Sequence, residues 1–467
     1  MKKAIFLCLM SIALMPIRTS AQEYQSFFPP EEFKARWEKV FEKIGSEAVV
    51  IVQGAPDPGG YIIPRQTNEF YYLCGVENPF SYLLLDGRTK KAILFLSRAI
   101  GSGDSVLSTR NPDVAKQLTG VDSVTTPDRL TIPRVRYIYT LFSPAESAGQ
   151  TRADLQSRDS RILSDPWDGR ISRETHFVSL LMARNPRAEI KDLTLILDEM
   201  RSIKSPREIE VMRRAGQLAA QAVIEAMRAA QPGMYEYQLE AVARYTFIVN
   251  GVRLEGYRSI LPAGVKNIGD MHYYFNSSQL KDGDLVLMDY APDCGYYTSD
   301  IGRMFPVNGT FSPWQREICQ FILEYHKAII QRIRPGVTTR QILDEVKIAM
   351  EPVFIKTKFS KPEYERAARR LVESSGGAFS HTVGLAVHDD GRYGSGPLQP
   401  GQVFAVDPQL RVSEEGLYMR IEDTVVVTEN GVEVLTRFAP SELNEIEKLM
   451  KEEGIVQKFP PIPPIKK

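Results

Sequence analysis

The segment from 285 to 303 constrains the fold of this chain more than any other. Two short apolar runs flank the turn-forming residues at 292–295, and this pattern predicts two antiparallel strands joined by a turn. Asp289 lies near the end of the first expected strand, and Asp300 lies on the second, eleven residues later. Burial in apolar strands strips a carboxylate of its hydration, which is costly unless another group neutralises the charge. One aspartate beside a turn is usually a turn or capping residue, but two on facing strands favour a functional pair.

The N-terminal residues have the three parts of a secretory signal peptide. Lys2 and Lys3 form a basic segment, an apolar stretch covers 4–15, and small residues at 19–21 precede an expected cleavage before Gln22. The apolar stretch is too short to span a bilayer comfortably. A buried N-terminal helix and an uncleaved anchor are the alternatives. We expect a periplasmic or secreted protein with no membrane span in its mature chain.

Charge and cysteine content exclude several classes of protein. The chain has 467 residues, enough for two or three domains. It carries 58 basic and 58 acidic residues; removal of residues 1–21 takes away three basic residues and no acidic one, which leaves a net charge of −3. A nucleic-acid partner would favour a basic excess, so none is expected. The three cysteines that remain are too few for a disulfide framework.

Residues 22–200 are predicted to form an α/β domain, because helical and strand-like apolar patterns alternate there. Helices are expected over 33–44 and 170–184, and strands over 48–53, 70–74, 81–85 and 92–96.

Residues 201–440 are predicted to form a second, α+β domain. Ser205, Pro206 and Glu208 form a helix start: a capping side chain, a proline in the first turn and a glutamate three residues after the cap. Residues 441–467 should form a charged helix and a Pro-rich tail, extended or disordered. Further helices are expected over 206–230, 235–250, 313–334 and 337–354, and further strands over 381–387, 403–406 and 418–428.

Four carboxylates and one imidazole lie in or beside the strands predicted in the second domain: Asp289, Asp300, His381, Asp407 and Glu422. A mostly oxygen donor set suits manganese, cobalt, zinc or iron(II) better than soft metals. Two divalent ions would balance four carboxylates, which would answer the burial problem of the first pair. The alternative is five unrelated polar residues at strand ends, and that is the better guess for each residue taken singly.

In their local context, these residues resemble the aminopeptidase P family of pita-bread metallopeptidases. The motifs are MHY at 271–273, GDLVLMD at 283–289, SD at 299–300, SH at 380–381, VHD at 387–389 and RIED at 420–423, with NEFYYLCG at 68–75 in the first domain. The resemblance implies an N-terminal aminopeptidase P-like domain followed by a pita-bread catalytic domain. It also implies the reaction, hydrolysis of the N-terminal Xaa-Pro bond of a peptide with proline at its second position.

The resemblance further implies that the five residues bind two divalent ions, with manganese expected and cobalt, zinc or iron as alternatives. Asp300 and Glu422 would bridge both ions, and His381 would bind one. His272 and His388 would face the substrate. A metal-bridged hydroxide would attack the scissile carbonyl, and His388 would stabilise the charge that develops on its oxygen.

The remaining polar candidates have more ordinary alternatives. Arg420 should share a strand face with the glutamate two residues later, and we expect it to balance the carboxylates rather than contact substrate. His272 could be a loop histidine, and His388 could cap a turn. His176 and His326 fall in helical patterns and are expected to be surface or packing residues.

Four positions depart from the pattern of the family. Asp407 lies where the family normally has the longer Glu, and Arg411 lies where it often has Tyr. Gly377 replaces a usual histidine four residues before the metal-binding one. In the short segment 391–401, Arg392 is the only candidate for a substrate-contacting arginine. Metal binding is therefore better supported than the exact substrate preference.

Three other functions share parts of this pattern. A prolidase would cleave Xaa-Pro dipeptides, and a creatinase-like enzyme, which uses no metal, would not need all five ligand positions. A metal-free pita-bread protein would only bind peptides.

Proline lacks an N–H and has a fixed φ, so a dedicated pocket can recognise an Xaa-Pro bond. A homodimer is expected.

Overall fold

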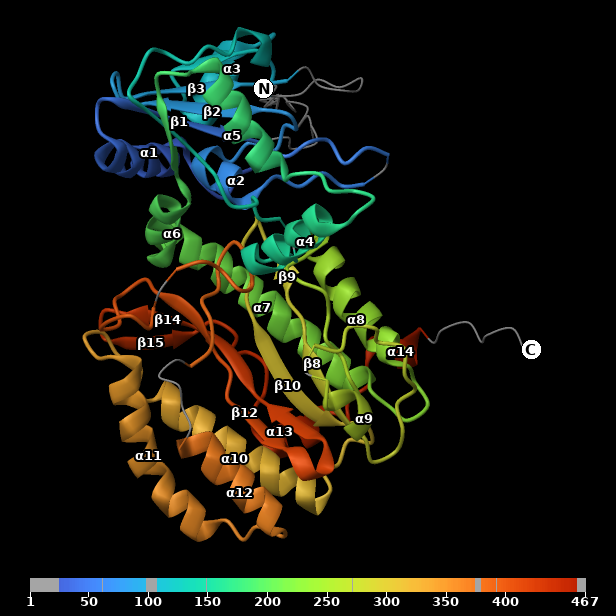
Figure 1. Cartoon of the computed structure of the whole chain (residues 1–467). Coiled ribbons are helices and arrows are strands. Elements are labelled where there is room, and N and C mark those ends of the chain that lie inside the picture. Colours follow the sequence, from blue (N-terminus) through green and yellow to red (C-terminus); the bar gives the residue numbers. More distant parts are fainter. Residues whose placement is uncertain are drawn as a thin grey trace, which may run out of the picture.

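The computed structural model describes residues 25–60, 62–97, 107–147, 149–270, 272–373, 379–391 and 393–459 (Figure 1). The predicted signal peptide, Met271, Gly377, Arg392 and the Pro-rich tail beyond Phe459 lie outside these residues. Within the described ranges, no helix is long and apolar enough to cross a membrane.

The N-terminal domain is built on a mixed sheet of six strands in the order β4-β3-β2-β1-β5-β6. Its central strand β1 pairs antiparallel with β2 and parallel with β5, and its first five residues are buried, which explains its continuous apolar sequence. The strands are β1 (Ala48–Gln53), β2 (Tyr82–Asp86), β3 (Lys91–Phe95), β4 (Ser123–Thr125), β5 (Tyr137–Thr140) and β6 (Glu189–Asp192). The helices are α1 (Pro30–Ile44), α2 (Asn68–Cys74), α3 (Pro112–Thr119), α4 (Arg152–Ser164), α5 (Arg173–Arg184) and α6 (Thr194–Ser202).

Most elements predicted in this domain are confirmed, but the strand predicted over 70–74 is wrong. These residues belong to helix α2, in which every residue is buried. Gly75 ends the helix with a left-handed φ of 64°, a conformation that favours glycine. A short apolar run without periodicity does not distinguish a buried strand from a buried helix, and this explains the error.

The C-terminal domain is built on a five-stranded antiparallel sheet in the order β11-β14-β10-β8, with β15 also paired to β14. Its strands are β8 (Leu285–Asp289), β10 (Ile301–Pro306), β11 (Val403–Val406), β14 (Glu422–Thr428) and β15 (Gly431–Val434). Two smaller ladders pair β7 (Leu254–Glu255) with β9 (Pro292–Asp293) and β12 (Gln409–Val412) with β13 (Leu417–Arg420). The helices are α7 (Pro206–Ala229), α8 (Glu236–Val249), α9 (Gly264–Ile268), α10 (Pro313–Ile330), α11 (Thr339–Lys356), α12 (Pro362–Glu373), α13 (Leu443–Leu449) and α14 (Ile455–Lys458).

The predicted start of α7 is confirmed in atomic detail. The Ser205 Oγ accepts a hydrogen bond from the Glu208 amide at 3.2 Å, and the Glu208 carboxylate accepts one from the Ser205 amide at 2.8 Å. This reciprocal capping satisfies two backbone donors at the helix end. Helices α8, α10 and α11 also lie within a few residues of their predicted positions.

Four predictions in the C-terminal domain need correction, and the first is the single strand over 418–428, which forms two strands, β13 and β14, in separate sheets. Strands β8 and β10 do pair antiparallel, but β9 lies between them in the sequence, so the connection is longer than a tight turn, and Asp300 directly precedes β10. No strand forms over 381–387, where only Thr382 makes a single bridge, to Phe404. The charged segment after Ser441 forms two short helices, α13 and α14, instead of one.

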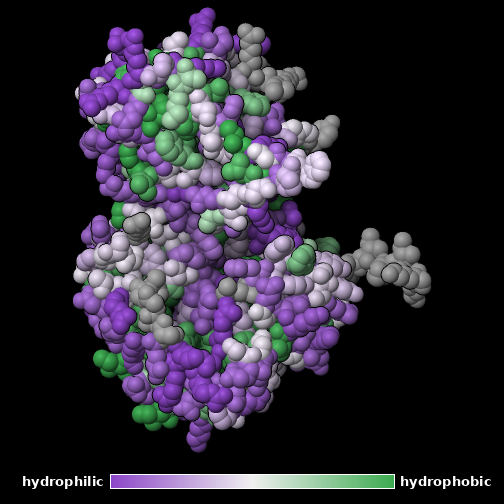
Figure 2. Space-filling view, viewed as in Figure 1, coloured by the Kyte–Doolittle hydropathy of each residue, from purple (hydrophilic) through white to green (hydrophobic). Residues whose placement is uncertain are grey.

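The two domains are joined by α6 and the start of α7 (Figure 1). Aromatic side chains pack across their contact. Tyr71 of α2 stacks on Tyr296 with ring centroids 3.5 Å apart, and Phe28 packs on Tyr297. On the face shown in Figure 2 the surface is mostly hydrophilic, also where the two domains meet, while hydrophobic residues gather over α5. These aromatic contacts hold the N-terminal domain against the C-terminal domain.

Candidate metal centre

The strand register explains why three of the predicted ligands meet. Gly302 of β10 is the cross-strand partner of both Asp289 on β8 and Glu422 on β14. Residues directly opposite each other in a sheet share a face, and strand alternation brings the side chain of Asp300 to that same face. A Cβ at Gly302 would lie 3.0 Å from the Glu422 Cβ, so glycine leaves room for the carboxylates. The sheet therefore gathers three carboxylates around one position that has no side chain.

The other two predicted ligands come from the neighbouring edge. Asp407 directly follows β11, the strand that pairs with β14 on its other side. His381 is tied to β11 because the Ala405 amide donates to its carbonyl oxygen at 2.9 Å. The His381 Nε2 lies 3.4 Å from Asp300 Oδ2 and 3.9 Å from Glu422 Oε1. All five predicted ligands thus lie in one region.

The carboxylates of this region are buried and short of hydrogen-bond donors. Each of the four is at most 5% exposed. Among the residues that the structure describes, both oxygens of Glu422 and the Oδ1 of Asp407 have no hydrogen-bond partner. Asp300, His381 and Glu422 offer donor atoms that lie within 4.8 Å of one another. Buried acceptors without donors need a compensating cation, and this oxygen-rich set with one imidazole fits a hard or borderline divalent metal.

The titration behaviour of the residues reflects this crowding. Burial raises the pKa of Asp407 to about 7. The hydrogen bond from Gln409 acts to lower this pKa, and the charge of Asp300 acts to raise it. Burial also raises the pKa of Glu422 well above its usual value, and the charges of Asp300 and Asp407 add to the shift. For His381, burial disfavours the charged ring, but the contact with Asp300 outweighs it and raises the pKa. Positive charge is therefore scarce relative to the carboxylates.

Arg420 supplies part of the missing positive charge. Its Nη2 contacts Asp289 Oδ2, and its Nη1 lies 3.5 Å from Asp407 Oδ2 and 3.6 Å from Glu422 Oε2. The side chain is 6% exposed, so it faces the carboxylates rather than solvent. This position is compatible with the predicted charge-balancing role, which stays a prediction.

Two residues of the site were not anticipated from the sequence. The Tyr257 hydroxyl lies 2.6 Å from Asp289 Oδ1 and 2.9 Å from Asp300 Oδ1, so these two acceptors share its single O–H donor. The Gln409 side-chain amide donates to Asp407 Oδ2 at 2.6 Å. Gln409 lies two residues after Asp407, a spacing that could have drawn attention to it. Nothing near Tyr257 in the sequence indicates its role, because its partners lie more than thirty residues away.

Of the two predicted substrate-facing histidines, His388 lies against the predicted ligand His381. The rings of His388 and His381 have centroids 3.9 Å apart. Burial, followed by the charge of His381, lowers the pKa of His388 to about 4, and His272 adds a smaller effect of the same sign. His272 itself is exposed. Of the other two histidines, His176 is exposed and His326 is buried, as their helical patterns suggested.

Comparison with known proteins identifies the family. Residues 210–429 match metallopeptidase family M24, and residues 33–131 match the aminopeptidase P N-terminal domain. The chain is 33% identical over 448 residues to the Xaa-Pro aminopeptidase of Haemophilus influenzae, an alignment that covers 91% of this chain and 99% of that protein. This chain belongs to the aminopeptidase P group of metallopeptidase family M24.

Other members of the aminopeptidase P group support the same assignment. The Xaa-Pro aminopeptidase of Escherichia coli is 30% identical over 447 residues, covering 90% of this chain and 97% of that protein. The structure of zinc-substituted E. coli aminopeptidase P in complex with product is similar with a TM-score of 0.72 at 29% identity, covering 91% of this chain and 99% of that one. The predicted fold class, an aminopeptidase P-like domain followed by a pita-bread domain, is confirmed.

Proposed function

We propose that this protein is a metal-dependent aminopeptidase that hydrolyses the N-terminal Xaa-Pro bond of peptides. The observation that carries the proposal is the set of buried carboxylate oxygens on Glu422 and Asp407 that no described donor satisfies. The similarity to the Xaa-Pro aminopeptidases of H. influenzae and E. coli, over nearly the full length of each, supplies the substrate class.

The residues that would hold two divalent ions are Asp289, Asp300, His381, Asp407 and Glu422. Manganese is the expected metal, with cobalt, zinc or iron as alternatives, and the zinc-substituted relative from E. coli supports a site that accepts more than one metal. When bound, paired divalent ions lower the pKa of a water molecule and polarise a carbonyl group.

The protein's own residues orient this chemistry. Tyr257 and Arg420 hold Asp289 from two sides, which fixes the direction of its carboxylate. His388 has a lowered pKa of about 4, so near neutral pH its ring is uncharged and can donate one N–H to the oxygen of a substrate carbonyl. His272, exposed in its loop, would contact the peptide at the entrance of the site.

Several finer features belong to the same proposal. We place the domain boundaries at 22–200 and 201–440, followed by the C-terminal segment 441–467. We further propose export through the signal peptide at 1–21, and a homodimer as the working state. The peptide substrate would carry proline at its second position.

The decisive experiment compares hydrolysis of Xaa-Pro-Yaa tripeptides with that of Xaa-Pro dipeptides, each with and without manganese. We expect metal-dependent release of the N-terminal residue from tripeptides, and none from a matched Xaa-Ala-Yaa peptide. Faster cleavage of dipeptides would instead support a prolidase. A purified protein that takes up no stoichiometric metal on reconstitution would overturn the enzyme proposal in favour of peptide binding alone.

A further inference from the structure

The loop between the two histidines of the site has little regular structure to hold it. Residues 381–391 contain no helix or strand, and the loop closes on itself, since the Asp389 amide donates to the Thr382 carbonyl at 3.0 Å. At its end, the backbone of Gly391 lies so close to α6 that a Cβ there would meet the Ser202 Cα at 3.1 Å. Its φ of 135° also favours glycine. The position of His388 therefore depends on what holds this loop from outside.

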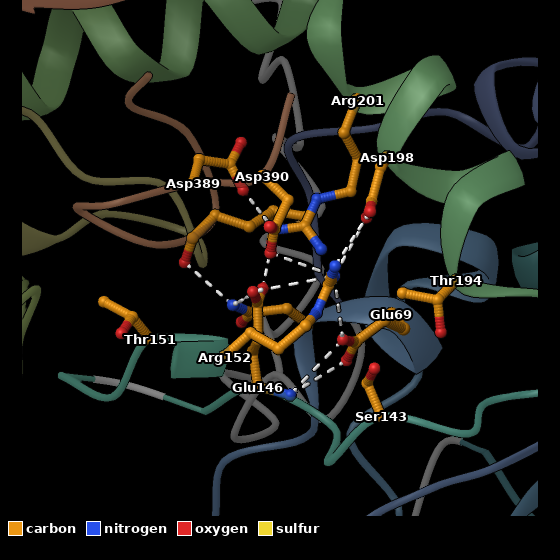
Figure 3. Close-up of polar contacts among 12 residues, drawn as sticks. Glu69, Ser143, Glu146, Thr151, Arg152, Thr194, Asp198, Arg201, Asp389 and Asp390 are labelled. Atoms are coloured by element: carbon orange, nitrogen blue, oxygen red, sulfur yellow. Dashed lines mark hydrogen bonds and ion pairs between the residues drawn. The ribbon is translucent and has the colours of Figure 1, made fainter. Parts of the chain in front are cut away.

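Charged side chains from both domains meet at Asp389 and Asp390, near the end of this loop, as Figure 3 shows. We call this group the interdomain cluster; it comprises Glu69, Glu146, Arg152, Asp198, Arg201, Lys204, Asp389 and Asp390. Glu69, Glu146, Arg152 and Asp198 come from the N-terminal domain, and only Asp389 and Asp390 belong to the loop. The cluster thus connects the N-terminal domain to a loop of the active site.

Asp389, the neighbour of His388, is held by two cations. Arg201 of α6 contacts its Oδ1 through Nη2, and the Lys204 Nζ lies 3.1 Å from its Oδ2. The same Arg201 nitrogen lies 2.6 Å from Glu146 Oε2, so one guanidinium joins a carboxylate of the N-terminal domain to one of the loop. The side chains of Arg201, Asp389 and Lys204 are each 1% exposed. Water therefore does not compete for these ion pairs.

The N-terminal domain also holds the loop at two further points. The Arg152 Nη2 lies 3.0 Å from Asp390 Oδ2, and the guanidinium is itself fixed by two hydrogen bonds to Asp198, of 2.8 and 2.9 Å. The Asn68 side-chain amide donates to the Leu385 carbonyl at 3.1 Å. Side chains outside the loop thus fix it at three places, and two of these lie within two residues of His388.

We propose that the interdomain cluster is a positioning device for His388, through which the N-terminal domain contributes to catalysis. This inference rests on the proposed function for its kinetic consequence. A catalytic group displaced by about 1 Å can lose on the order of a hundredfold in rate, so a loop released from the cluster should slow the reaction. The competing explanation is that the cluster only joins the two domains.

A matched pair of substitutions separates these explanations. Asp389→Asn removes a buried carboxylate that pairs with Arg201 in the cluster. Asp293→Asn removes a buried carboxylate that pairs with Arg65 across the same domain contact, at 2.6 Å, but outside the cluster. We expect Asp389→Asn to lower kcat on an Xaa-Pro-Yaa tripeptide by on the order of tenfold or more, with KM nearly unchanged. Asp293→Asn should keep the kcat of the wild type.

A second measurement does not depend on activity. In protein labelled with ¹³C at histidine Cε1, His388→Gln identifies the His388 signal by its loss. Arg152→Gln, which changes a side chain far from His388 in the sequence, should shift that signal in the metal-free protein, whereas Asp293→Asn should leave it in place. Circular dichroism on each variant checks that the chain is folded.

The outcomes distinguish this inference from the proposed function. An unmoved His388 signal in Arg152→Gln, or an equal loss of kcat in Asp389→Asn and Asp293→Asn, would overturn the positioning role. If the wild type hydrolyses no Xaa-Pro peptide, the proposed function is wrong, and the His388 signal alone decides whether the cluster holds the loop.

Discussion

Without metal, Glu422→Gln should be more stable than the wild type. With divalent ions present, it should lack the stabilisation that these ions give to the wild type. Glu422 is 1% exposed, and neither of its oxygens has a hydrogen-bond partner among the described residues. An unsatisfied buried polar group costs about 1–3 kcal/mol, and more when it is charged. Glutamine keeps the shape, carries no charge and can donate to a neighbouring carboxylate. We therefore expect the metal-free variant to be more stable than the metal-free wild type by about 1–3 kcal/mol.

The pH dependence of this difference follows from the pKa of Glu422. Burial, with Asp300 and Asp407, raises that pKa in the folded protein. The stability contributed by the protonated carboxyl is therefore complete below its unfolded pKa and is lost as the pH rises through the folded pKa. The advantage of Glu422→Gln should be small in mild acid and should grow as the pH rises.

Bound metal should reverse the order of stability. A ligand present at about a hundred times its dissociation constant stabilises the folded state by about 2.7 kcal/mol per site. The wild type should gain this from both ions, whereas Glu422→Gln, which lacks one of the four carboxylate charges, should gain little and lose nearly all activity. Thermal unfolding at about pH 8 in chelator and in manganese measures both arms. A metal-free variant less stable than the metal-free wild type, or a variant with full activity, would refute the reasoning.

Three further predictions concern the same site and the cluster beside it. Elemental analysis of the reconstituted protein should find about two divalent ions per chain. In the same measurement Asp407→Ala should lose one of these ions more readily than the other, whereas Asp407→Glu should keep both ions and should still hydrolyse the tripeptide. Tyr257→Phe removes the hydroxyl that holds two ligand carboxylates, and it should weaken metal affinity by on the order of tenfold in a chelator titration. Burial is the largest cause that raises the pKa of Glu69 and of Asp390 to about 8. The free energy of unfolding that these two protonated carboxyls contribute should therefore fall as the pH rises towards 8. Thermal unfolding of Glu69→Gln should show a smaller fall.

The sequence was most informative where local rules decide the structure. The capping pair Ser205 and Glu208 forms as predicted because its two hydrogen bonds depend on residues three apart. The aspartates of the 285–303 segment were visible because carboxylates in apolar strands are costly. Residues 381–387, part of the irregular loop 381–391, were predicted as a strand because their apolar residues suit one, whereas polar and charged side chains from other segments hold this loop. Tyr257 escaped notice for the same reason, since only the tertiary fold brings its hydroxyl to its partners.

Asp407 and Arg411, two of the four predicted departures from the family pattern, lie just before and within one small ladder of strands, whereas Gly377 and Arg392 lie outside the described residues. The ladder of β12 and β13 pairs Gln409 with Arg420 and Arg411 with Tyr418, and strand alternation puts these four side chains on one face. Gln409 and Arg420 reach Asp407 from that face. Arg411 lies over the ring of Tyr418, with its guanidinium carbon 4.7 Å from the ring centroid. The buried Tyr418 hydroxyl has no hydrogen-bond partner among the described residues. The phenol of Tyr418, on the strand opposite Arg411, thus lies beside the carboxylates. Arg411→Tyr alone would place a second aromatic ring against that of Tyr418.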